Sequence, residues 1–294
     1  METIKQNELN AFLLIYFFEL EIFINSNTNA LREIKFQSEE ANTDEFIKKY
    51  FKDLILSRNC ISGTSIKKLS ISSLEQLQNF EVENLLKFKI TAVYIPEELS
   101  VEHKINIAKS KKSVYTNPDV LLKIEDGENT FYESLELKST KTNNIPGASV
   151  QQVAPFEWVI FVKRGAQIIE VSTGYYINCI TQKLSFPDRS PRPQIGFNTL
   201  HEWNYKNRII QGGILTIIDN PEISLQKIKL LQDWQGFLAT EWMAIITSNE
   251  AKNNEKWFNN TLRIFAIKFL EHTNNISIEE KAKLLAKLNE LVKQ

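Results

Sequence analysis

The chain has 294 residues, 43% of them hydrophobic, and a formal net charge of −1 at pH 7. This length and composition predict one large domain or a core with helical additions, and the near-neutral charge gives no sign of a polyanionic partner. The two cysteines, Cys60 and Cys179, form no metal-binding spacing, and we expect reduced thiols as in cytosolic proteins. The three histidines are scattered and no glycine-rich phosphate loop occurs, which disfavours a zinc enzyme and an ATPase.

Residues 1–100 are predicted to be mainly helical, with helices at about 5–25, 43–57 and 73–88. The first of these contains the apolar run Ala11–Ile24, which includes two glutamates. Such a run is too short and too charged to span a bilayer, and it lacks the basic flank and the small-residue cleavage site of a signal peptide. We therefore expect a helix that is buried or faces a partner, and no membrane association.

A β-hairpin is predicted in the middle of the chain. Residues 119–125 alternate as a strand does, 126–129 (Asp-Gly-Glu-Asn) form a turn signal, and 130–140 continue as a second strand. If the turn is centred between its second and third residues, opposed residues have numbers that sum to 255. Asp119 then faces Glu136, with Cβ atoms about 5 Å apart on one face of the sheet.

Two opposed carboxylates repel each other, and a hard divalent cation removes that repulsion. Mg²⁺ is usually held by one or two carboxylates together with water and substrate phosphate. Lys138 is two residues from Glu136 and therefore lies on the same face, where it can orient or deprotonate a water and offset developing negative charge. This trio is what a magnesium-dependent phosphodiesterase needs, although a Glu-x-Lys on an exposed strand is often only solvated charge.

The elements that follow strengthen the catalytic interpretation. After the second strand come a polar loop, a short helix expected from about Ser149, and an apolar strand at Trp158–Arg164. With Pro118-Asp119 followed by Glu136-Leu137-Lys138, this order resembles the core of the PD-(D/E)xK nuclease fold. The segment as a whole resembles type II restriction endonucleases.

This resemblance implies roles for individual residues. Asp119 and Glu136 match the metal ligands, Lys138 matches the catalytic lysine, and the backbone carbonyl of Leu137 is a further ligand. Many members of the family add a glutamate from a preceding helix, for which Glu45 is a candidate. In the first turn of a helix, however, a carboxylate is favourable for electrostatic reasons alone.

The resemblance also implies an α/β fold whose mixed central sheet is of the restriction-endonuclease-like (PD-(D/E)xK) type, with helical N- and C-terminal additions. We expect a helical region at 1–100, a catalytic core at 101–220 and a helical region at 221–294, all in one compact domain. Ser277 and Glu280 form a capping box that opens a last helix. The leucines on one side of this helix are explained most simply by core packing, with dimerisation as the alternative.

Three segments are candidates for contacting DNA, because Asn and Gln pair with adenine while Arg and Lys pair with guanine or phosphate. One follows the second hairpin strand and is continued by the glutamines that open the expected short helix, one is a proline-rich loop, and one is Arg58-Asn59. An ordinary surface loop is the alternative in each case. The candidate residues are Lys141, Asn143, Asn144, Gln151, Gln152, Arg189 and Arg192.

The expected function is that of a type II site-specific deoxyribonuclease, which cuts both strands of a short double-stranded DNA sequence with Mg²⁺. The resemblance implies a homodimer in the bacterial cytoplasm, and a cognate DNA methyltransferase as a functional rather than physical partner. Two alternatives remain. One is a structure-specific repair or recombination nuclease of the same fold, and the other is a DNA-binding module without catalysis.

Overall fold

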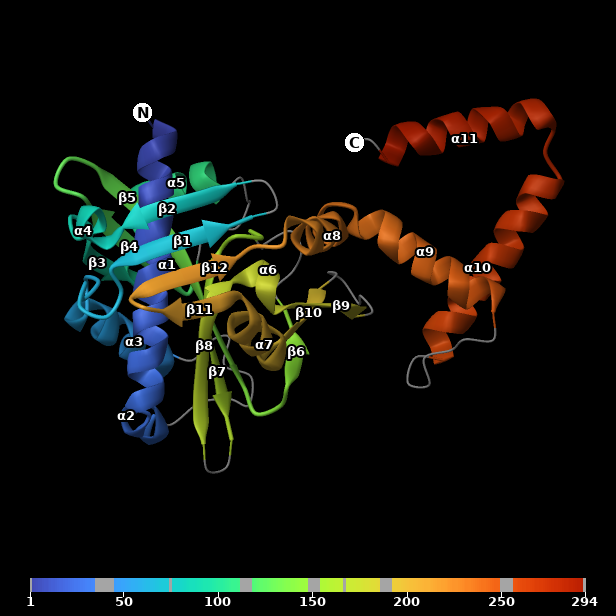
Figure 1. Cartoon of the computed structure of the whole chain (residues 1–294). Helices are drawn as coiled ribbons and strands as arrows, with labels where there is room; N and C mark the ends of the chain where they lie inside the picture. The colour runs from blue at the N-terminus through green and yellow to red at the C-terminus, as the bar shows by residue number, and fades with distance from the viewer. Residues whose placement is uncertain are drawn as a thin grey trace. The chain divides into compact units, whose positions relative to one another are not determined.

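The computed structural model forms two compact units, Met1–Gln232 and Asp233–Gln294. Figure 1 shows strands and helices in the first unit and helices in the second. The structure describes residues 2–34, 45–73, 76–111, 118–147, 154–165, 168–185, 192–248 and 256–292.

A five-stranded sheet runs through the first unit in the order β3-β4-β5-β7-β8. The pair β5–β7 is parallel and the other three pairs are antiparallel, so the sheet is mixed and the expected α/β class is confirmed. The parallel pair requires a crossover connection, which occupies the segment between these two strands. The strands are β3 (Lys89–Tyr94), β4 (Val120–Glu125), β5 (Thr130–Thr140), β7 (Trp158–Arg164) and β8 (Ile169–Tyr175).

The β4–β5 hairpin has the predicted register. Val120 pairs with Leu135, and the numbers of paired residues sum to 255 throughout the ladder. The turn is held by the Asp126 carboxylate, which accepts a hydrogen bond of 2.7 Å from the Asn129 backbone N–H. Gly127 has φ 93°, a left-handed conformation that glycine adopts without a Cβ clash. A short polar turn therefore fixes the register of the two strands.

A four-stranded sheet has the order β11-β12-β1-β2, and a three-stranded sheet has the order β6-β10-β9. The predicted helix at 73–88 is wrong, because β2 and the short helix α4 (Val82–Leu85) lie there. Pairing of β1 with both β2 and the distant β12 overrides the local helical pattern. The remaining strands are β1 (Lys68–Ser72), β2 (Leu77–Glu81), β6 (Asn144–Pro146), β9 (Ile180–Ser185), β10 (Arg192–Gly196), β11 (Arg208–Gln211) and β12 (Ile214–Ile218).

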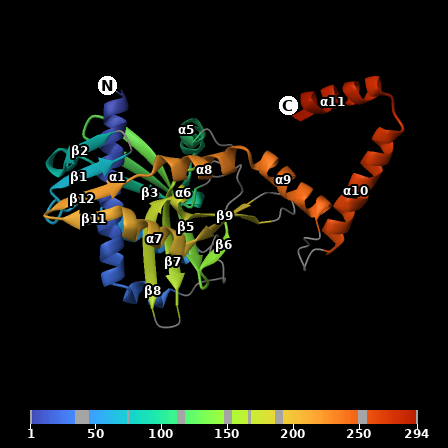
Figure 2. The same cartoon turned by 45° about the vertical axis from the view of Figure 1, so that its right-hand side comes forward.

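Helix α1 (Glu2–Ser26) passes between the four-stranded and five-stranded sheets (Figures 1 and 2). Residues 11–17 are all buried, as in a helix that is apolar on every side and enclosed by a core. They share one cluster with side chains of both sheets. One helix in the described part of the chain, α1, is long and apolar enough to cross a membrane over Lys5–Ser26, and 56% of its apolar window is buried inside the protein. The expectation of a buried helix is confirmed. The expectation of a segment too short and too charged to span a bilayer is wrong, because the helix extends beyond the apolar run on both sides.

The face of the five-stranded sheet that points away from α1 is covered by α5 (Val101–Lys111) and α7 (Phe197–Asn207). The ring of Phe197 packs edge-on against Phe161 of β7 at 5.7 Å, and His103 of α5 lies 5.7 Å from Tyr132 of β5. A stretch of this face between α5 and α7 carries the polar residues of the hairpin. The other helices of the first unit are α2 (Asn29–Glu33), α3 (Glu45–Ser57), α6 (Tyr176–Cys179) and α8 (Pro221–Gln232), with a 3₁₀ turn at Pro96–Glu98.

The second unit consists of α9 (Trp234–Thr247), α10 (Lys256–Asn274) and α11 (Ile278–Val292). The predicted capping box is confirmed, because the Ser277 backbone N–H donates to Glu280 Oε2 at 2.8 Å and the Glu280 N–H donates to Ser277 Oγ at 3.2 Å. The expectation of core packing for the leucines of α11 is wrong. None of the residues of this helix is buried.

A buried ion pair fastens α1 to the strands beside it. Arg208 Nη1 lies 3.1 Å from Glu21 Oε2, and the Thr173 backbone N–H donates to the same carboxylate at 2.7 Å. Arg208 also donates from Nη2 to the Thr173 carbonyl at 2.7 Å. The glutamate inside the apolar run is therefore explained by a partner that β11 supplies from far along the chain.

We expect Glu21→Leu to destabilise the protein by about 3–5 kcal/mol, because it leaves the Arg208 guanidinium buried without an anion. Urea denaturation followed by circular dichroism measures the free energy of unfolding. Glu8→Gln, on the same helix in a more exposed pair with Lys87, is the control and should leave this free energy nearly unchanged. An equal loss of unfolding free energy in Glu21→Leu and Glu8→Gln would contradict a stabilising role of the buried pair of Glu21 and Arg208.

Candidate active site

Asp119 lies directly before β4, and its side chain points at two partners. Its carboxylate Oδ2 accepts a hydrogen bond of 3.0 Å from the backbone N–H of Leu137 in β5, and its Oδ1 lies 3.1 Å from Lys48 Nζ of α3. The residue is only 8% exposed. The hydrogen bond to β5 thus extends the contact between the two strands to the residue before β4 and holds the carboxylate at a defined place.

Glu136 and Lys138 stand two residues apart on β5, so their side chains leave the same face of the sheet. They form an ion pair in which Lys138 Nζ donates to Glu136 Oε1. Lys138 is 2% exposed, and a buried ammonium is tolerated only with anionic partners. The structure therefore brings together all three residues of the predicted trio.

Burial and mutual repulsion change the protonation of this cluster. The pKa of Asp119 is raised to about 6, first by burial and then by the charge of Glu136, while Lys138, Lys48 and the hydrogen bond from Leu137 oppose the shift. Burial alone would lower the pKa of Lys138, but the carboxylates of Glu136 and Asp119 outweigh burial and raise it. Lys138 consequently carries a positive charge at neutral pH, which suits positioning and charge stabilisation.

Two further charged residues join the trio, and sequence reasoning missed both. Lys48 comes from α3, whose buried residues Ile47, Phe51 and Ile55 face the core and leave Lys48 at the edge of the apolar face. Glu157 is 7% exposed, and its charge contributes to the raised pKa of Lys138. The sequence feature that could have identified Lys48 is its position beside the apolar stripe of α3, which directs its side chain along the edge of the core.

The position of Glu157 follows from the parallel pairing of β5 with β7. Glu136 pairs with Val159, and paired residues of neighbouring strands point to the same face. Glu157, two residues before Val159, therefore shares the face of Glu136. The sequence alone does not reveal the register between β5 and β7, and Glu157 could therefore not be identified from it.

Glu45 is placed differently from the trio. Its carboxylate forms an ion pair with Lys49 one turn along α3, on the solvent side of the helix. The hydrogen bond from Lys49 lowers the pKa of Glu45. This is the arrangement of a favourable carboxylate in a first helical turn, and it gives no support to a metal-ligand role.

The cluster has a donor set suited to Mg²⁺. Mg²⁺ keeps several waters and is commonly bound by one or two carboxylates plus substrate oxygens, which Asp119 and Glu136 satisfy. Within the described ranges, no group of three or more His, Cys, Asp or Glu side chains is arranged to hold a metal ion. The predicted third ligand is a main-chain oxygen, the Leu137 carbonyl, and this role stays a prediction.

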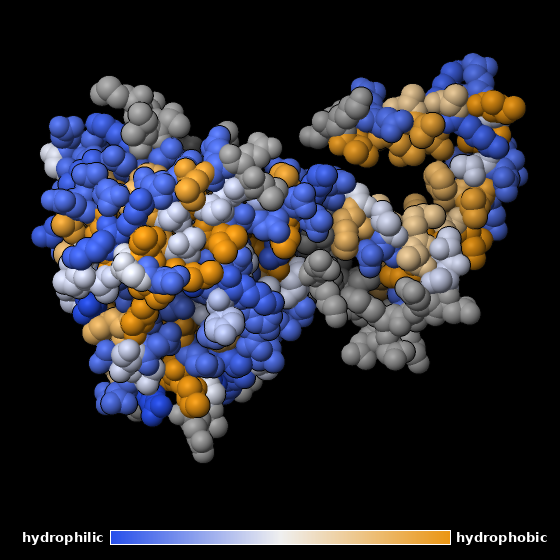
Figure 3. Space-filling model, in the orientation of Figure 1, coloured by the Kyte–Doolittle hydropathy of each residue, from blue (hydrophilic) through white to orange (hydrophobic). Residues whose placement is uncertain are grey.

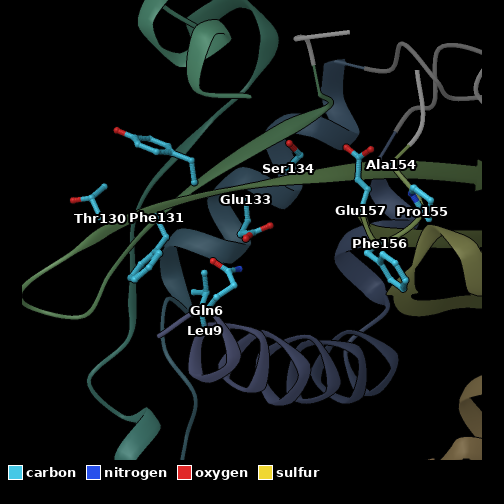
Figure 4. A pocket seen from close by; sticks show the side chains of 11 residues that line it. Gln6, Leu9, Thr130, Phe131, Glu133, Ser134, Ala154, Pro155, Phe156 and Glu157 are labelled. Atoms are coloured by element: carbon cyan, nitrogen blue, oxygen red, sulfur yellow. The ribbon is translucent and has the colours of Figure 1, made fainter. Parts of the chain in front are cut away.

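A cavity of about 780 Å³ is lined by Glu157 and by residues of α1 and β5, but not by Asp119, Glu136 or Lys138. It lies along the first half of β5, before the pairing with β7 begins at Leu135 and Trp158. Figure 4 shows Ser134 and Glu157 pointing to the same side of β5, whereas Phe156 points toward α1. Ser134 lies two residues before Glu136 on the same face of β5, so this wall of the cavity is next to the trio along the strand.

The predicted DNA-binding residues are only partly described. Residues 141–144, which include Lys141, Asn143 and Asn144, form an exposed segment directly after β5. Gln151, Gln152 and Arg189 lie outside the described residues, as does the expected short helix from Ser149. Arg192 begins β10, but its side chain is outside the described part.

The chain was compared with protein-family models, with curated proteins and with solved structures, and none of these comparisons gives a match. The functional argument therefore depends on the geometry of the cluster itself.

We expect Lys48→Met to destabilise the protein by about 3 kcal/mol near pH 8, because Asp119 then loses its cationic partner in a buried site. Chemical denaturation of the wild type, of Lys48→Met and of a control variant, Lys49→Met, measures the free energy of unfolding. The difference in free energy of unfolding between the wild type and Lys48→Met should narrow as the pH falls through about 6, because Asp119 then takes up a proton and loses its charge. Lys49→Met, on the exposed side of the same helix, is the control and should change little.

Proposed function

We propose that this protein is a magnesium-dependent deoxyribonuclease of the PD-(D/E)xK type. The observation that carries the proposal is the register of the β4–β5 hairpin, which places Asp119, Glu136 and Lys138 together. Solvated charges on a strand have no reason to be buried, yet Asp119 and Lys138 are among the least exposed polar residues of the chain. A buried group of opposite charges beside a cavity is typical of a functional site.

The arrangement of elements around the trio supports the same fold type. The hairpin carries the trio, β7 follows in parallel to β5, and helices lie on both faces of the mixed sheet. The order of these strands agrees with the one that the sequence resemblance to type II restriction endonucleases implies, while the short helix expected between β5 and β7 lies outside the described residues. It supports site-specific cutting of both strands of a short double-stranded DNA sequence as the first candidate function.

The proposed reaction is hydrolysis of a phosphodiester bond without a covalent intermediate. A Mg²⁺ ion bound by Asp119, Glu136 and the Leu137 carbonyl would supply Lewis acidity and lower the pKa of a bound water. The charged Lys138 orients the attacking water and offsets negative charge on the phosphoryl oxygens. As the water oxygen bonds to phosphorus, the bond from phosphorus to the leaving deoxyribose oxygen breaks.

Two alternatives keep the same cluster. A repair or recombination nuclease of this fold would recognise DNA structure rather than sequence, and a binding module would hold DNA without cutting it. The presence of all three residues, Asp119, Glu136 and Lys138, favours catalysis over binding alone, because a site without chemistry has little reason to keep them. A restriction endonuclease would act in the bacterial cytoplasm beside a methyltransferase that protects the host DNA, as the family resemblance implies.

We expect the wild-type protein to cut unmethylated phage DNA into discrete fragments with Mg²⁺ and to leave it intact with EDTA. Lys138→Ala should reduce the rate by roughly a thousandfold or more, because the charge beside the phosphoryl group is lost. Lys123→Ala is the matched control, since Lys123 lies on the same hairpin in a more exposed pair with Glu125, and it should cut at the wild-type rate. Gel electrophoresis of a time course gives the rates.

Other outcomes separate the alternatives. A smear in place of discrete fragments would favour the structure-specific nuclease. DNA that stays intact with a folded protein, although binding is measurable with and without Mg²⁺, would favour the binding module. Cutting by Lys138→Ala at the control rate would contradict the role of this lysine.

Metal binding gives a readout that is independent of cutting. We expect MgCl₂ to raise the midpoint of thermal unfolding at about pH 8, because a ligand that binds only the folded state stabilises it. The shift should disappear below about pH 6, because a protonated Asp119 does not ligate a metal. Asp119→Asn should show no shift at either pH. A shift that Asp119→Asn retains would place the metal elsewhere.

A further inference from the structure

The proposed metal ligand Asp119 already has a cation beside it. Its Oδ1 lies 3.1 Å from Lys48 Nζ of α3, and its Oδ2 accepts the backbone N–H of Leu137 at 3.0 Å. Both oxygens of the carboxylate are therefore in contact with a positively polarised group. A divalent cation that binds Asp119 comes close to the ammonium of Lys48, and two positive charges at such a separation repel each other.

The pair of Lys48 and Asp119 differs from the solvated ion pairs of the protein. Figure 3 shows hydrophilic residues over much of the visible face of the first unit, where water and salt screen the charges. The side chains of Lys48 and Asp119 are only 12% and 11% exposed. Those of Lys49 and Glu45, on the same helix, are 55% and 54% exposed. Repulsion between Lys48 and a metal ion is therefore poorly screened, whereas Lys49 exerts little.

The charges around Asp119 balance without a metal ion. Asp119 has the ammonium of Lys48 as its partner and Glu136 has that of Lys138, so these four side chains carry no net charge. A divalent cation adds two positive charges in a largely buried place, which is unfavourable. Glu157, whose charge acts on Lys138, offsets at most one of them. A phosphodiester group supplies further negative charge, and Mg²⁺ is commonly bound together with substrate phosphate.

Lys48 leaves Asp119 more easily than the other donor does. The Leu137 donor is a backbone N–H held in β5, but the ammonium of Lys48 ends a flexible four-carbon chain. Its helix is anchored by Ile47 and Phe51, which are 1% and 0% exposed, so the side chain moves while the backbone stays. A second anion within reach of this chain, such as a DNA phosphate, therefore competes with Asp119 for the ammonium.

We propose that Lys48 competes with the divalent cation for Asp119, and that a phosphate of the DNA relieves this competition by taking over the ammonium. Lys48 is then a positioning residue that acts through Asp119. It keeps the cation weakly bound in the free protein and lets it bind tightly beside the substrate. The coupling is reciprocal, so the cation also strengthens the binding of DNA. This role rests on the proposed nuclease function, because it requires a metal ion at Asp119.

The test without DNA is a titration of the protein with MgCl₂ at pH 8, followed by the midpoint of thermal unfolding. We expect Lys48→Met to bind Mg²⁺ on the order of tenfold more tightly than the wild type, because a poorly screened positive charge is removed. A purely structural role of Lys48 would lower the midpoint and leave its dependence on Mg²⁺ unchanged. Lys48→Arg keeps the charge and should bind Mg²⁺ as the wild type does.

The matched control is Lys49→Met, which removes the same charge from the exposed side of α3. Solvent screens that charge, so the Mg²⁺ affinity of this variant should equal that of the wild type. A gain in Lys49→Met as large as that in Lys48→Met would reduce the effect to net charge and overturn the proposal. Equal Mg²⁺ affinities of Lys48→Met and the wild type would overturn it as well.

The test with DNA uses the cutting assay. The Mg²⁺ concentration that gives half the maximal rate on phage DNA reports the affinity beside the substrate. The ratio of the Mg²⁺ affinities with and without DNA should be on the order of tenfold larger for the wild type than for Lys48→Met, because only the wild type has a lysine to transfer. Equal ratios in the two proteins would overturn the role of the DNA phosphate.

Amine labelling of the wild type provides a measurement that does not depend on folding of Lys48→Met. Limited acetylation with acetic anhydride, followed by mass spectrometry of peptides, measures the accessibility of each lysine. Saturating MgCl₂ should increase the labelling of Lys48, which leaves its buried partner, and should not change that of Lys49. Labelling of Lys48 that stays the same with bound Mg²⁺ would contradict the displacement.

Failure of this proposal is distinguishable from failure of the nuclease function. If neither the wild type nor Lys48→Met binds Mg²⁺, the proposed metal site is wrong and the competition falls with it. If Lys48→Met binds Mg²⁺ more tightly but neither protein cuts DNA, the competition is supported and the nuclease function is not. Cutting by a wild type whose Mg²⁺ affinity equals that of Lys48→Met would overturn the competition alone.

Discussion

The candidate site depends on one pairing, the antiparallel register between β4 and β5. On one face of this hairpin Val120, Leu122 and Leu135 enter the apolar core, and on the other Asp119 and Glu136 meet. A slip of one residue would exchange the two faces of a strand and bury its charges in the core. The core thus fixes the position of the charged residues as firmly as any contact among them. The apolar side of the sheet and its polar chemistry are consequences of one alignment.

Electrostatics then decides how such a cluster can exist in a folded chain. Burying a carboxylate is unfavourable unless an opposite charge or hydrogen bonds replace its water. Asp119 receives a backbone N–H and the ammonium of Lys48, and Glu136 receives that of Lys138. The two carboxylates therefore stay buried because each has an ammonium group as its partner.

Local patterns were sufficient for the hairpin, for the bounds of α3 and α11, and for the trio, because these depend on residues close together in the chain. They failed at β2, where pairing with a strand whose own partner lies far away overrides a helical pattern. Lys48 and Glu157 reach the site through a helix and a parallel strand whose positions no local rule provides. On α11 the sequence identified an apolar side correctly but could not say what covers it, since periodicity reports a face and not its partner.

The enclosure of α1 by two sheets has a consequence for synthesis of the chain. This helix is synthesised before β12, which helps to cover it and follows about 190 residues later. At roughly 5–20 residues per second, its apolar surface waits on the order of ten to forty seconds for that cover. During this interval the nascent chain exposes its most apolar segment and is open to aggregation or to capture by chaperones. The order of the elements thus means that α1 is enclosed only after most of the first unit has been synthesised.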